Sequence, residues 1–250
     1  MPDVRARFLG CLAGLAVGDA VGAALEFRAR GTFAPIRDMV GGGPFRLAPG
    51  QWTDDTSMAL CLAASLVETG RFDPRDQMER YCRWYETGYM SSTGRCFDIG
   101  RTVAQALQHY RRTGEVWAGP TDPNTAGNGC IMRLAPVALW AYPDEEAAEQ
   151  YAADSARTTH GAVECVDACR LFGRILVRAL AGRSKEEVLL ADAGRFAGAA
   201  SIGAIARGEY RQRPESAIRG SGYVVESLEA ALWCFWQADS FAEAVLRAAN

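Results

Sequence analysis

The stretch Gly50-Gln-Trp-Thr-Asp-Asp-Thr56 places oxygen-bearing side chains at four consecutive positions, just before an apolar run. Adjacent carboxylates repel each other, and a divalent cation removes that repulsion. Because Mg²⁺ and Ca²⁺ take oxygen ligands, Thr53, Asp54 and Asp55 are candidate ligands for a hard cation. The same residues could instead be only the cap and acidic first turn of a helix. Both interpretations stay open on the local sequence.

A second candidate carboxylate is Asp98, within Phe97-Asp-Ile-Gly100. It could cap a helix over 99–112. It could also act as a general acid or base if it faces a cleft.

A glycine-rich turn, Gly127-Asn128-Gly129, opens an apolar segment. Its spacing matches neither a Walker loop nor a dinucleotide fingerprint. Backbone N–H groups at such a turn can hold phosphate with the help of the helix dipole. An ordinary tight turn explains the glycines equally well.

The chain has two histidines. His109 lies in a helix that we expect to be solvated. His160 precedes Gly161 at an expected helix start, where a protonated imidazole is disfavoured, so we expect it to be neutral. Tyr223 follows Gly222 and could either stack on a base or pack in the core.

In the segments that must position these residues, apolar side chains recur mainly with the helical period. The predicted helices are 4–27, 55–68, 75–87, 99–112, 128–141, 144–157, 161–182, 185–207, 224–237 and 240–249. No alternating β segment, repeat or linker stands out, so the sequence predicts one compact all-α domain over 1–250. The helices that are apolar on most faces should be central, namely 128–141, 165–182 and 224–236.

The N-terminus resembles a signal peptide, because two arginines precede the apolar run from Phe8 to Gly18. Asp19 interrupts that run and disfavours a membrane span. Glycines at every fourth position from Gly10 to Gly22 form one stripe that would let another helix approach closely. We therefore predict a buried core helix here.

Composition and charge indicate which binding partners and which cellular compartment to expect. The formal net charge is −3 and no basic block is present, so nucleic acid is not an expected partner, and neither is a membrane. Eight cysteines without a CxxC pair predict reduced, mostly buried thiols and a cytoplasmic protein.

Taken in order, six segments of the chain resemble the ADP-ribosylglycohydrolase family, and the resemblance runs from about residue 8 to Asn250. The segments are 18–27, 50–56, 97–100, 127–136, 159–161 and 222–233. The resemblance implies an all-α fold and two Mg²⁺ ions, with Mn²⁺ possible. It also implies hydrolysis of the glycosidic bond between ADP-ribose and a protein side chain or small-molecule acceptor.

The resemblance also implies roles for single residues. Thr53, Asp54 and Asp55 would be metal ligands, and Glu26 and Asp98 would be the catalytic carboxyls, as acid or base in either order. Tyr223 would lie near the adenine. The implied substrate-binding residues are Gly127, Asn128, Gly129, Cys130, Met132, His160 and Tyr223.

The family pattern continues, after a segment like Ala244–Asn250, with a second metal motif, Asp-x-Asp-Thr. The sequence in hand stops before it. We therefore expect half of a metal site, either in part of a longer hydrolase or in a short form that binds ADP-ribose without cleaving it. A third possibility is an all-α scaffold whose polar clusters only cap helices.

Overall fold

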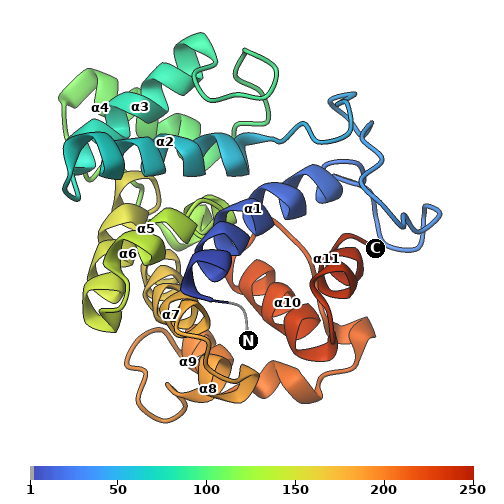
Figure 1. Ribbon diagram of the computed structural model, residues 1–250. Helices are drawn as coiled ribbons and strands as arrows, with labels where there is room; N and C mark the ends of the chain where they lie inside the picture. Colours follow the sequence, from blue (N-terminus) through green and yellow to red (C-terminus); the bar gives the residue numbers. More distant parts are fainter. Residues whose placement is uncertain (1–2) are drawn as a thin grey trace.

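The computed structural model describes residues 3–250 as helices joined by turns (Figure 1). The α-helices are α1 Val4–Gly22, α2 Asp54–Thr69, α3 Pro74–Thr87, α4 Arg101–Thr113, α5 Ala135–Ala141, α6 Glu145–Thr159, α7 Val163–Leu180, α8 Lys185–Leu190, α9 Ala200–Ala206, α10 Val224–Gln237 and α11 Phe241–Ala249. Short 3₁₀ helices lie at Pro123–Thr125, Asn128–Cys130, Glu209–Gln212 and Glu215–Ala217. Within residues 3–250, β pairing is limited to isolated bridges, so the all-α prediction is confirmed.

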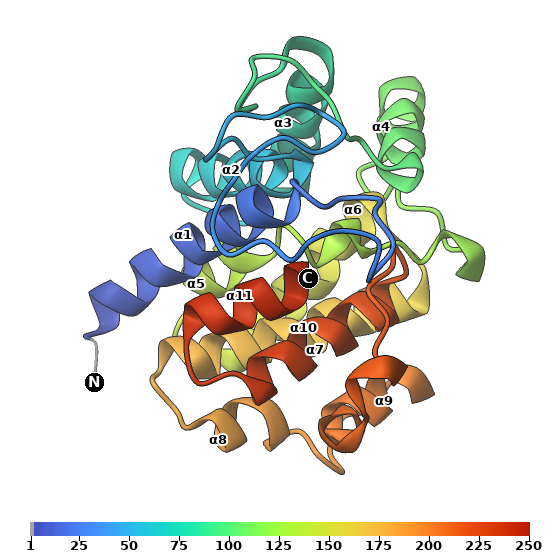
Figure 2. The same cartoon turned by 90° about the vertical axis from the view of Figure 1, so that its right-hand side faces the viewer.

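The centre of the fold is the pair α6 and α7, which pack against each other along their length. Small residues make this approach possible: a Cβ atom on Gly173 of α7 would lie 3.0 Å from both the carbonyl oxygen of Ala148 and the Cβ of Ala152. Figure 2 shows α7, α10 and α11 side by side, with α1 lying against α11. The predicted central positions of α5 and α7 are confirmed, because most of their residues are buried.

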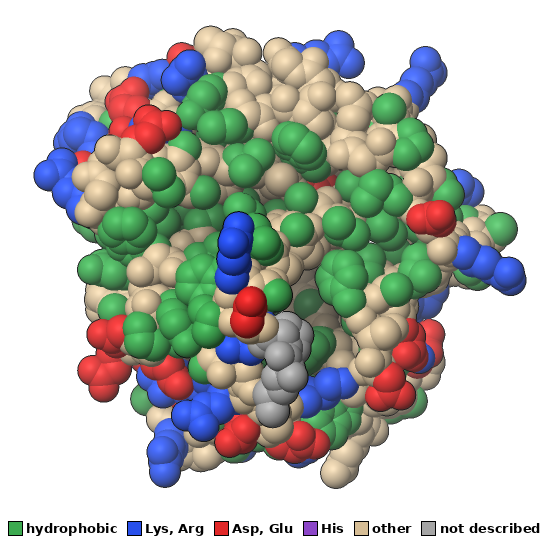
Figure 3. Space-filling model, in the orientation of Figure 1, with side chains coloured by type: hydrophobic (Ala, Val, Ile, Leu, Met, Phe, Trp, Pro, Cys, Tyr) green, Lys and Arg blue, Asp and Glu red, His purple; other side chains and the backbone are tan. Residues whose placement is uncertain are grey.

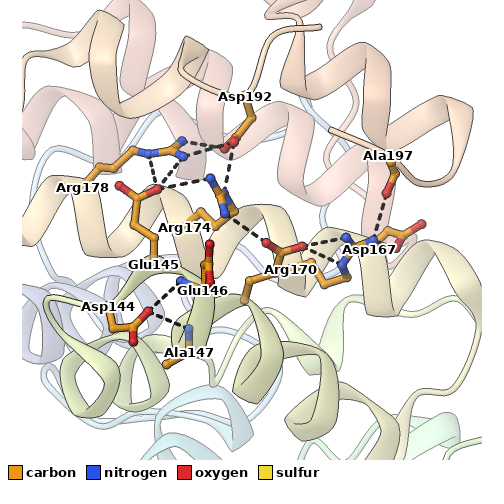
Figure 4. Close-up of polar contacts among 11 residues, drawn as sticks. Asp144, Glu145, Glu146, Ala147, Asp167, Arg170, Arg174, Arg178, Asp192 and Ala197 are labelled. Carbon is orange, nitrogen blue, oxygen red and sulfur yellow. Dashed lines mark hydrogen bonds and ion pairs between the residues drawn. The ribbon is translucent and has the colours of Figure 1, made fainter. Parts of the chain in front are cut away.

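Arginines spaced one turn apart along α7 form ion pairs with carboxylates of its neighbours (Figure 4). Arg170 and Arg174 both pair with Glu149 of α6, at 2.6 and 3.0 Å. Arg178, one turn further on, pairs with Glu145 at 2.6 Å and with Asp192, which follows α8. Pairing keeps the buried guanidinium and carboxylate from being left without partners, a loss that is costly away from water.

Two predicted helices are wrong as single elements. The helix predicted over 128–141 becomes a 3₁₀ turn and then α5, because Pro136 lacks the N–H that a continuous helix would need there. The helix predicted over 185–207 divides into α8 and α9. Between them Gly194 adopts a left-handed φ of +75°, and a Cβ on Gly198 would lie 2.6 Å from the carboxylate of Asp167.

The predicted core helix over 4–27 is also corrected. The helix α1 ends at Gly22 and lies mostly on the surface, with Ala20 and Val21 as its buried residues. The side chain of Leu9 is 65% exposed. Only the C-terminal end of α1 therefore enters the interior, and this end carries the residues that matter for the site.

The glycine stripe of α1 seats a neighbouring helix at one position. A Cβ on Gly14 would lie 3.4 Å from the ring of Phe241 in α11. At Gly10, Gly18 and Gly22 an added Cβ would meet no described atom within 4 Å. The stripe thus leaves open space beside the C-terminal half of α1.

None of the helices in residues 3–250 is both long and apolar enough to cross a membrane. The eight cysteines are free thiols, and six of them are buried.

Candidate active site

The first turn of α2 is held by a carboxylate from α1. Asp19 Oδ1 accepts hydrogen bonds from the backbone N–H and the hydroxyl of Thr53, at 3.0 and 2.8 Å. Its Oδ2 accepts the same pair from Thr56, at 3.0 and 2.6 Å. Thr53 occupies the N-cap position, but its own side chain makes no capping bond, so the simple capping interpretation is wrong for it.

Sequence reasoning missed the role of Asp19. It treated this residue only as an interruption of an apolar run. The available signal was that a carboxylate in such a run needs partners once the helix is buried. Its partners lie 34 and 37 positions away, and no local pattern identifies them.

Four further carboxyls meet where α1 ends and α2 begins. Asp54 is buried, while Glu26, Asp55 and Asp98 are half-buried. Burial and the charges of neighbouring carboxyls raise the pKa of Glu26 and of Asp55 to about 8. The same causes hold the pKa of Asp54 well above its usual value, and burial raises that of Asp98 to about 6. The cluster therefore retains protons near neutral pH.

Asp98 does not cap the helix that follows it. Gly100 is the N-cap of α4, and Asp98 adopts a left-handed φ of +60°, which is uncommon outside glycine. Its carboxyl is one of the neighbours that raise the pKa of Glu26, so the two carboxyls interact. Such strained backbone at a cluster of acids is typical of a functional site.

A pocket of about 290 Å³ opens beside these carboxyls. It lies between the C-terminal end of α1, the first turn of α2 and the last residues of α11. Its lining residues are Gly18, Asp19, Gly22, Ala23, Leu25, Glu26, Thr53, Asp55, Ala248 and Ala249. In the face of the molecule shown in Figure 3, apolar side chains cover the middle, over α1 and its neighbours. Most acidic side chains on this face lie toward its edges.

The chemistry of these donors fits a hard divalent cation. Carboxylate and hydroxyl oxygens are what Mg²⁺ and Mn²⁺ prefer, and a cation would offset the burial and the repulsion that raise the pKa values of Asp54 and Asp55. Among residues 3–250, however, no three His, Cys, Asp or Glu side chains are already placed as a ligand set. The residues described thus offer donors of the right kind in an incomplete arrangement.

The second predicted group lies around Gly127. Three segments that are distant in the sequence meet there: the glycine turn, the end of α6 and the residues just before α10. Gly127 pairs with Tyr223 in an isolated bridge. The N–H of Asn128 donates to the carbonyl of Gly222 at 2.9 Å, and the N–H of Gly127 donates to Thr125 at 2.7 Å. Because these two amides are engaged within the fold, any phosphate cradle at this turn must use other groups.

His160 lies directly beneath this turn. It ends α6 rather than starting a helix, contrary to the prediction. Its Nδ1 is hydrogen-bonded to the hydroxyl of Thr159 at 2.8 Å, and a Cβ on Gly129 would lie 2.9 Å from its Cε1. Burial lowers its pKa to about 4, so the imidazole is neutral as predicted, although burial rather than a helix start is the cause.

The remaining predicted substrate residues differ in access. Cys130 is fully buried, with its thiol close to the carbonyl of Gly127 at 3.8 Å. Met132 is half-buried against the core. Tyr223 is 38% exposed, and its hydroxyl donates to Glu164 at 2.6 Å. Of these three side chains, Tyr223 is the one most open to a ligand.

Arg133 is a second residue whose role sequence reasoning missed. It is fully buried and donates to the carbonyl of Gly129 at 3.1 Å and to the hydroxyl of Thr159 at 2.7 Å. Its guanidinium also lies 4.8 Å from the ring centroid of Tyr81. Arg133 therefore ties the glycine turn to the end of α6, and the only signal was a cation inside an apolar segment.

The comparisons with known proteins identify the family. The family model for ADP-ribosylglycohydrolase matches residues 1–250. The chain belongs to the ADP-ribosylglycohydrolase family. ADP-ribosylarginine hydrolase Tri1 from Pseudomonas putida (strain GB-1) is 48% identical over 244 residues, which are 98% of this chain and 65% of that protein. Tri1 from Serratia proteamaculans (strain 568) is 44% identical, over 96% of this chain and 65% of that protein.

Two further relatives are matched over more of their own length. ADP-ribosyl-[dinitrogen reductase] glycohydrolase from Rhodospirillum rubrum is 32% identical over 255 residues, covering 100% of this chain and 80% of that protein. A solved structure titled ADP-ribosylglycohydrolase-related protein complex superposes with a TM-score of 0.86 at 42% identity, covering 100% of this chain and 82% of that chain. The chain spans about two thirds of the length of the two Tri1 proteins. The resemblance noted from the six segments is confirmed.

In this chain the predicted residues form two neighbouring groups. One is the carboxyl cluster, and the other is the glycine turn with His160 and Tyr223. The start of α4 links them: the hydroxyl of Thr102, four residues after Asp98, donates to the carbonyl of Thr125 at 3.3 Å. A ligand that reaches from the turn to the carboxyls would cross the start of α4.

Proposed function

We propose that this protein hydrolyses the N-glycosidic bond between ADP-ribose and an arginine side chain, in a reaction that depends on Mg²⁺. Water is added across the bond, which gives free ADP-ribose and free arginine. The observation that carries the proposal is the convergence of four carboxyls with raised pKa values beside a pocket at the junction of α1 and α2. The names of the Tri1 relatives support arginine as the acceptor.

Thr53, Asp54 and Asp55 are the residues that we assign to metal binding. Bound Mg²⁺ would supply Lewis-acid chemistry and a more acidic bound water. Because Asp54 and Asp55 must lose protons to act as ligands, Mg²⁺ affinity should rise with pH through the neutral range.

Glu26 and Asp98 are the residues that we assign to bond cleavage. Glycoside hydrolysis passes through an oxocarbenium-like transition state that nearby carboxylates stabilise. The two carboxyls interact, because that of Asp98 raises the pKa of Glu26, so one can hold a proton while the other accepts one. The pair can therefore take a proton from the attacking water and return one to the departing guanidine.

The glycine turn, with His160 and Tyr223, is the part that we assign to ADP-ribose. The half-exposed ring of Tyr223 can stack on adenine. Neutral His160 supports the turn from below, where a charged imidazole would be buried at a cost. Gly129 is required there because the imidazole leaves no room for a side chain.

The test is release of ADP-ribose from an arginine-ADP-ribosylated protein, with Mg²⁺ and with EDTA. Wild-type protein should release ADP-ribose only with Mg²⁺. Asp54→Asn should abolish release with the fold intact by circular dichroism, whereas Asp239→Asn, an exposed acid between α10 and α11, should not. Full activity in Asp54→Asn would refute the metal assignment. Binding of ADP-ribose without release would favour a non-catalytic binding protein, and neither binding nor release would favour a scaffold.

We also propose a cellular compartment and a class of partner. We place the protein in the cytoplasm, which free, mostly buried thiols support. The expected partner is an ADP-ribosylated protein or a small ADP-ribose conjugate rather than nucleic acid or a membrane.

A further inference from the structure

Three phenylalanine rings form a chain beside the carboxyl cluster. The ring centroids of Phe27 and Phe45 lie 6.3 Å apart at an interplanar angle of 73°, and those of Phe45 and Phe97 lie 5.2 Å apart at 57°. We name these three residues the aromatic ridge. Phe27 is 81% exposed, so burial in the core does not explain the ridge.

The ridge and the carboxyls come from the same two turns. Phe27 follows Glu26, and Phe97 precedes Asp98, whose carboxyl is close enough to Glu26 to raise its pKa. Phe27 and Asp98 both adopt left-handed backbone, with φ of +61° and +60°. A bulky exposed residue in this conformation carries a strain that the surrounding structure must sustain.

The middle ring is carried by a tight hairpin. Gly42 and Leu47 exchange backbone hydrogen bonds at 2.7 and 2.9 Å, so Phe45 lies at the hairpin tip. Gly43 fixes the hairpin against the end of α1, because a Cβ there would collide with the carbonyl oxygen of Ala23. The ridge is therefore held in place before any ligand arrives, and binding to it requires little ordering.

An exposed aromatic surface next to carboxyls is complementary to a planar cation. Guanidinium groups stack on aromatic faces and are less strongly hydrated than ammonium groups. The carboxyls of Glu26 and Asp98 nearby can accept hydrogen bonds from guanidinium N–H groups whether or not they hold a proton. The ridge adjoins Glu26 and Asp98, which we assign to bond cleavage, and lies on other segments than the glycine turn that we assign to ADP-ribose, so the ridge suits the acceptor half of the substrate.

We propose that the aromatic ridge binds the acceptor guanidinium, with Phe27 as its main contact. The proposal rests on the proposed function, because it assigns the acceptor side of that same site. It makes Phe27 a specificity-determining residue that selects arginine-linked ADP-ribose.

The experiment measures the binding preference for ADP-ribosylarginine over free ADP-ribose by calorimetry. The Asp54→Asn background prevents cleavage during the measurement. Phe27→Leu keeps apolar volume but removes the π face, and it should reduce the preference roughly three- to tenfold. Phe27→Tyr keeps the face and should retain the preference. Phe235→Leu, an exposed phenylalanine on α10, is the matched control and should change nothing.

Each outcome decides the proposal separately from the hydrolase function. No preference in the parent, or a preference that survives Phe27→Leu, overturns it. An equal loss of affinity for free ADP-ribose in Phe27→Leu also overturns it, because the ring would then serve the ADP-ribose half. A preference lost in Phe27→Leu and kept in Phe27→Tyr supports the ridge even if wild-type protein releases no ADP-ribose, in which case the hydrolase function fails alone.

Discussion

Replacing Asp55 by asparagine should stabilise the protein without divalent cation while abolishing its activity. The folded-state pKa of Asp55 is about 8 against an ordinary value of 3.8, because burial and the charges of Asp19 and Asp98 disfavour ionisation. The folded protein therefore keeps a proton that the unfolded chain releases, and stability falls as pH rises between these two values. Asparagine cannot ionise, so the variant escapes this loss.

The magnitude follows from the interval between 3.8 and pH 7. At about 1.36 kcal/mol per pH unit, the upper limit of the gain is roughly 4 kcal/mol. Asp55 is only half-buried and shares protons with its neighbours, so we expect about 2 kcal/mol. For a chain of this length, that corresponds to a melting temperature higher by about 4–8 °C.

The assay is thermal unfolding in EDTA at pH 7 and pH 4.5, followed by circular dichroism. The gain should be largest at pH 7 and fall below about 1 kcal/mol at pH 4.5, because that pH is close to the ordinary value of 3.8, where the unfolded chain begins to hold the proton as well. Added Mg²⁺ should raise the melting temperature of wild type more than that of the variant.

Asp192→Asn is the control with the opposite sign. Burial raises the pKa of Asp192, but hydrogen bonds and charges from Arg178 and Arg174 outweigh burial and hold the pKa below its usual value. Its replacement should therefore lower stability by about 2 kcal/mol. A melting temperature of Asp55→Asn that is lower than wild type, or a gain that does not depend on pH, would refute the reasoning about the cluster.

Three further predictions concern the ADP-ribose side of the site. Gly129→Ala should weaken ADP-ribose binding about tenfold in calorimetry, because its Cβ would lie 2.9 Å from His160; Gly220→Ala, whose Cβ meets nothing within 4 Å, should bind normally. Because burial lowers the pKa of His160 to about 4, stability should be lost as pH falls from 6.5 toward 4, and His160→Gln should show a shallower fall in melting temperature over that range. Tyr223→Ala should weaken ADP-ribose binding about tenfold through lost stacking, and Tyr223→Phe should bind almost as wild type; equal losses would assign the effect to the hydroxyl bonded to Glu164.

The local sequence was sufficient to predict the bounds of helices whose apolar period and ends depend on their own residues. The α10 helix was predicted over its observed length, and α2 to within a residue at either end, because glycine at position 70 ends it in left-handed conformation. Prediction failed where tertiary contacts override the period. The break at Gly198 exists because the carboxylate of Asp167 occupies the space of a side chain and accepts the N–H of Ala199 at 2.7 Å.

The site shows the same division. Motif residues such as Asp54 and Asp98 could be named because their types and order resemble a family. The contacts that place them could not, since Asp19 reaches α2 across 34 residues and Arg133 reaches Thr159 across 26. Proton retention by the carboxyls was equally inaccessible, because it depends on their burial and mutual distance rather than on their identity.

The contact between Asp19 and α2 has a consequence for the order of folding. A helix normally supplies its own cap, so its first turn can form as soon as its residues leave the ribosome. Here the two amides at the start of α2 are satisfied by a side chain of α1. The turn that carries Asp54 and Asp55 thus gains its capping bonds only once the end of α1 has docked. A fully capped acidic turn therefore reports that α1 and α2 have docked correctly. Protection of the Thr53 and Thr56 amides from hydrogen exchange measures this docking.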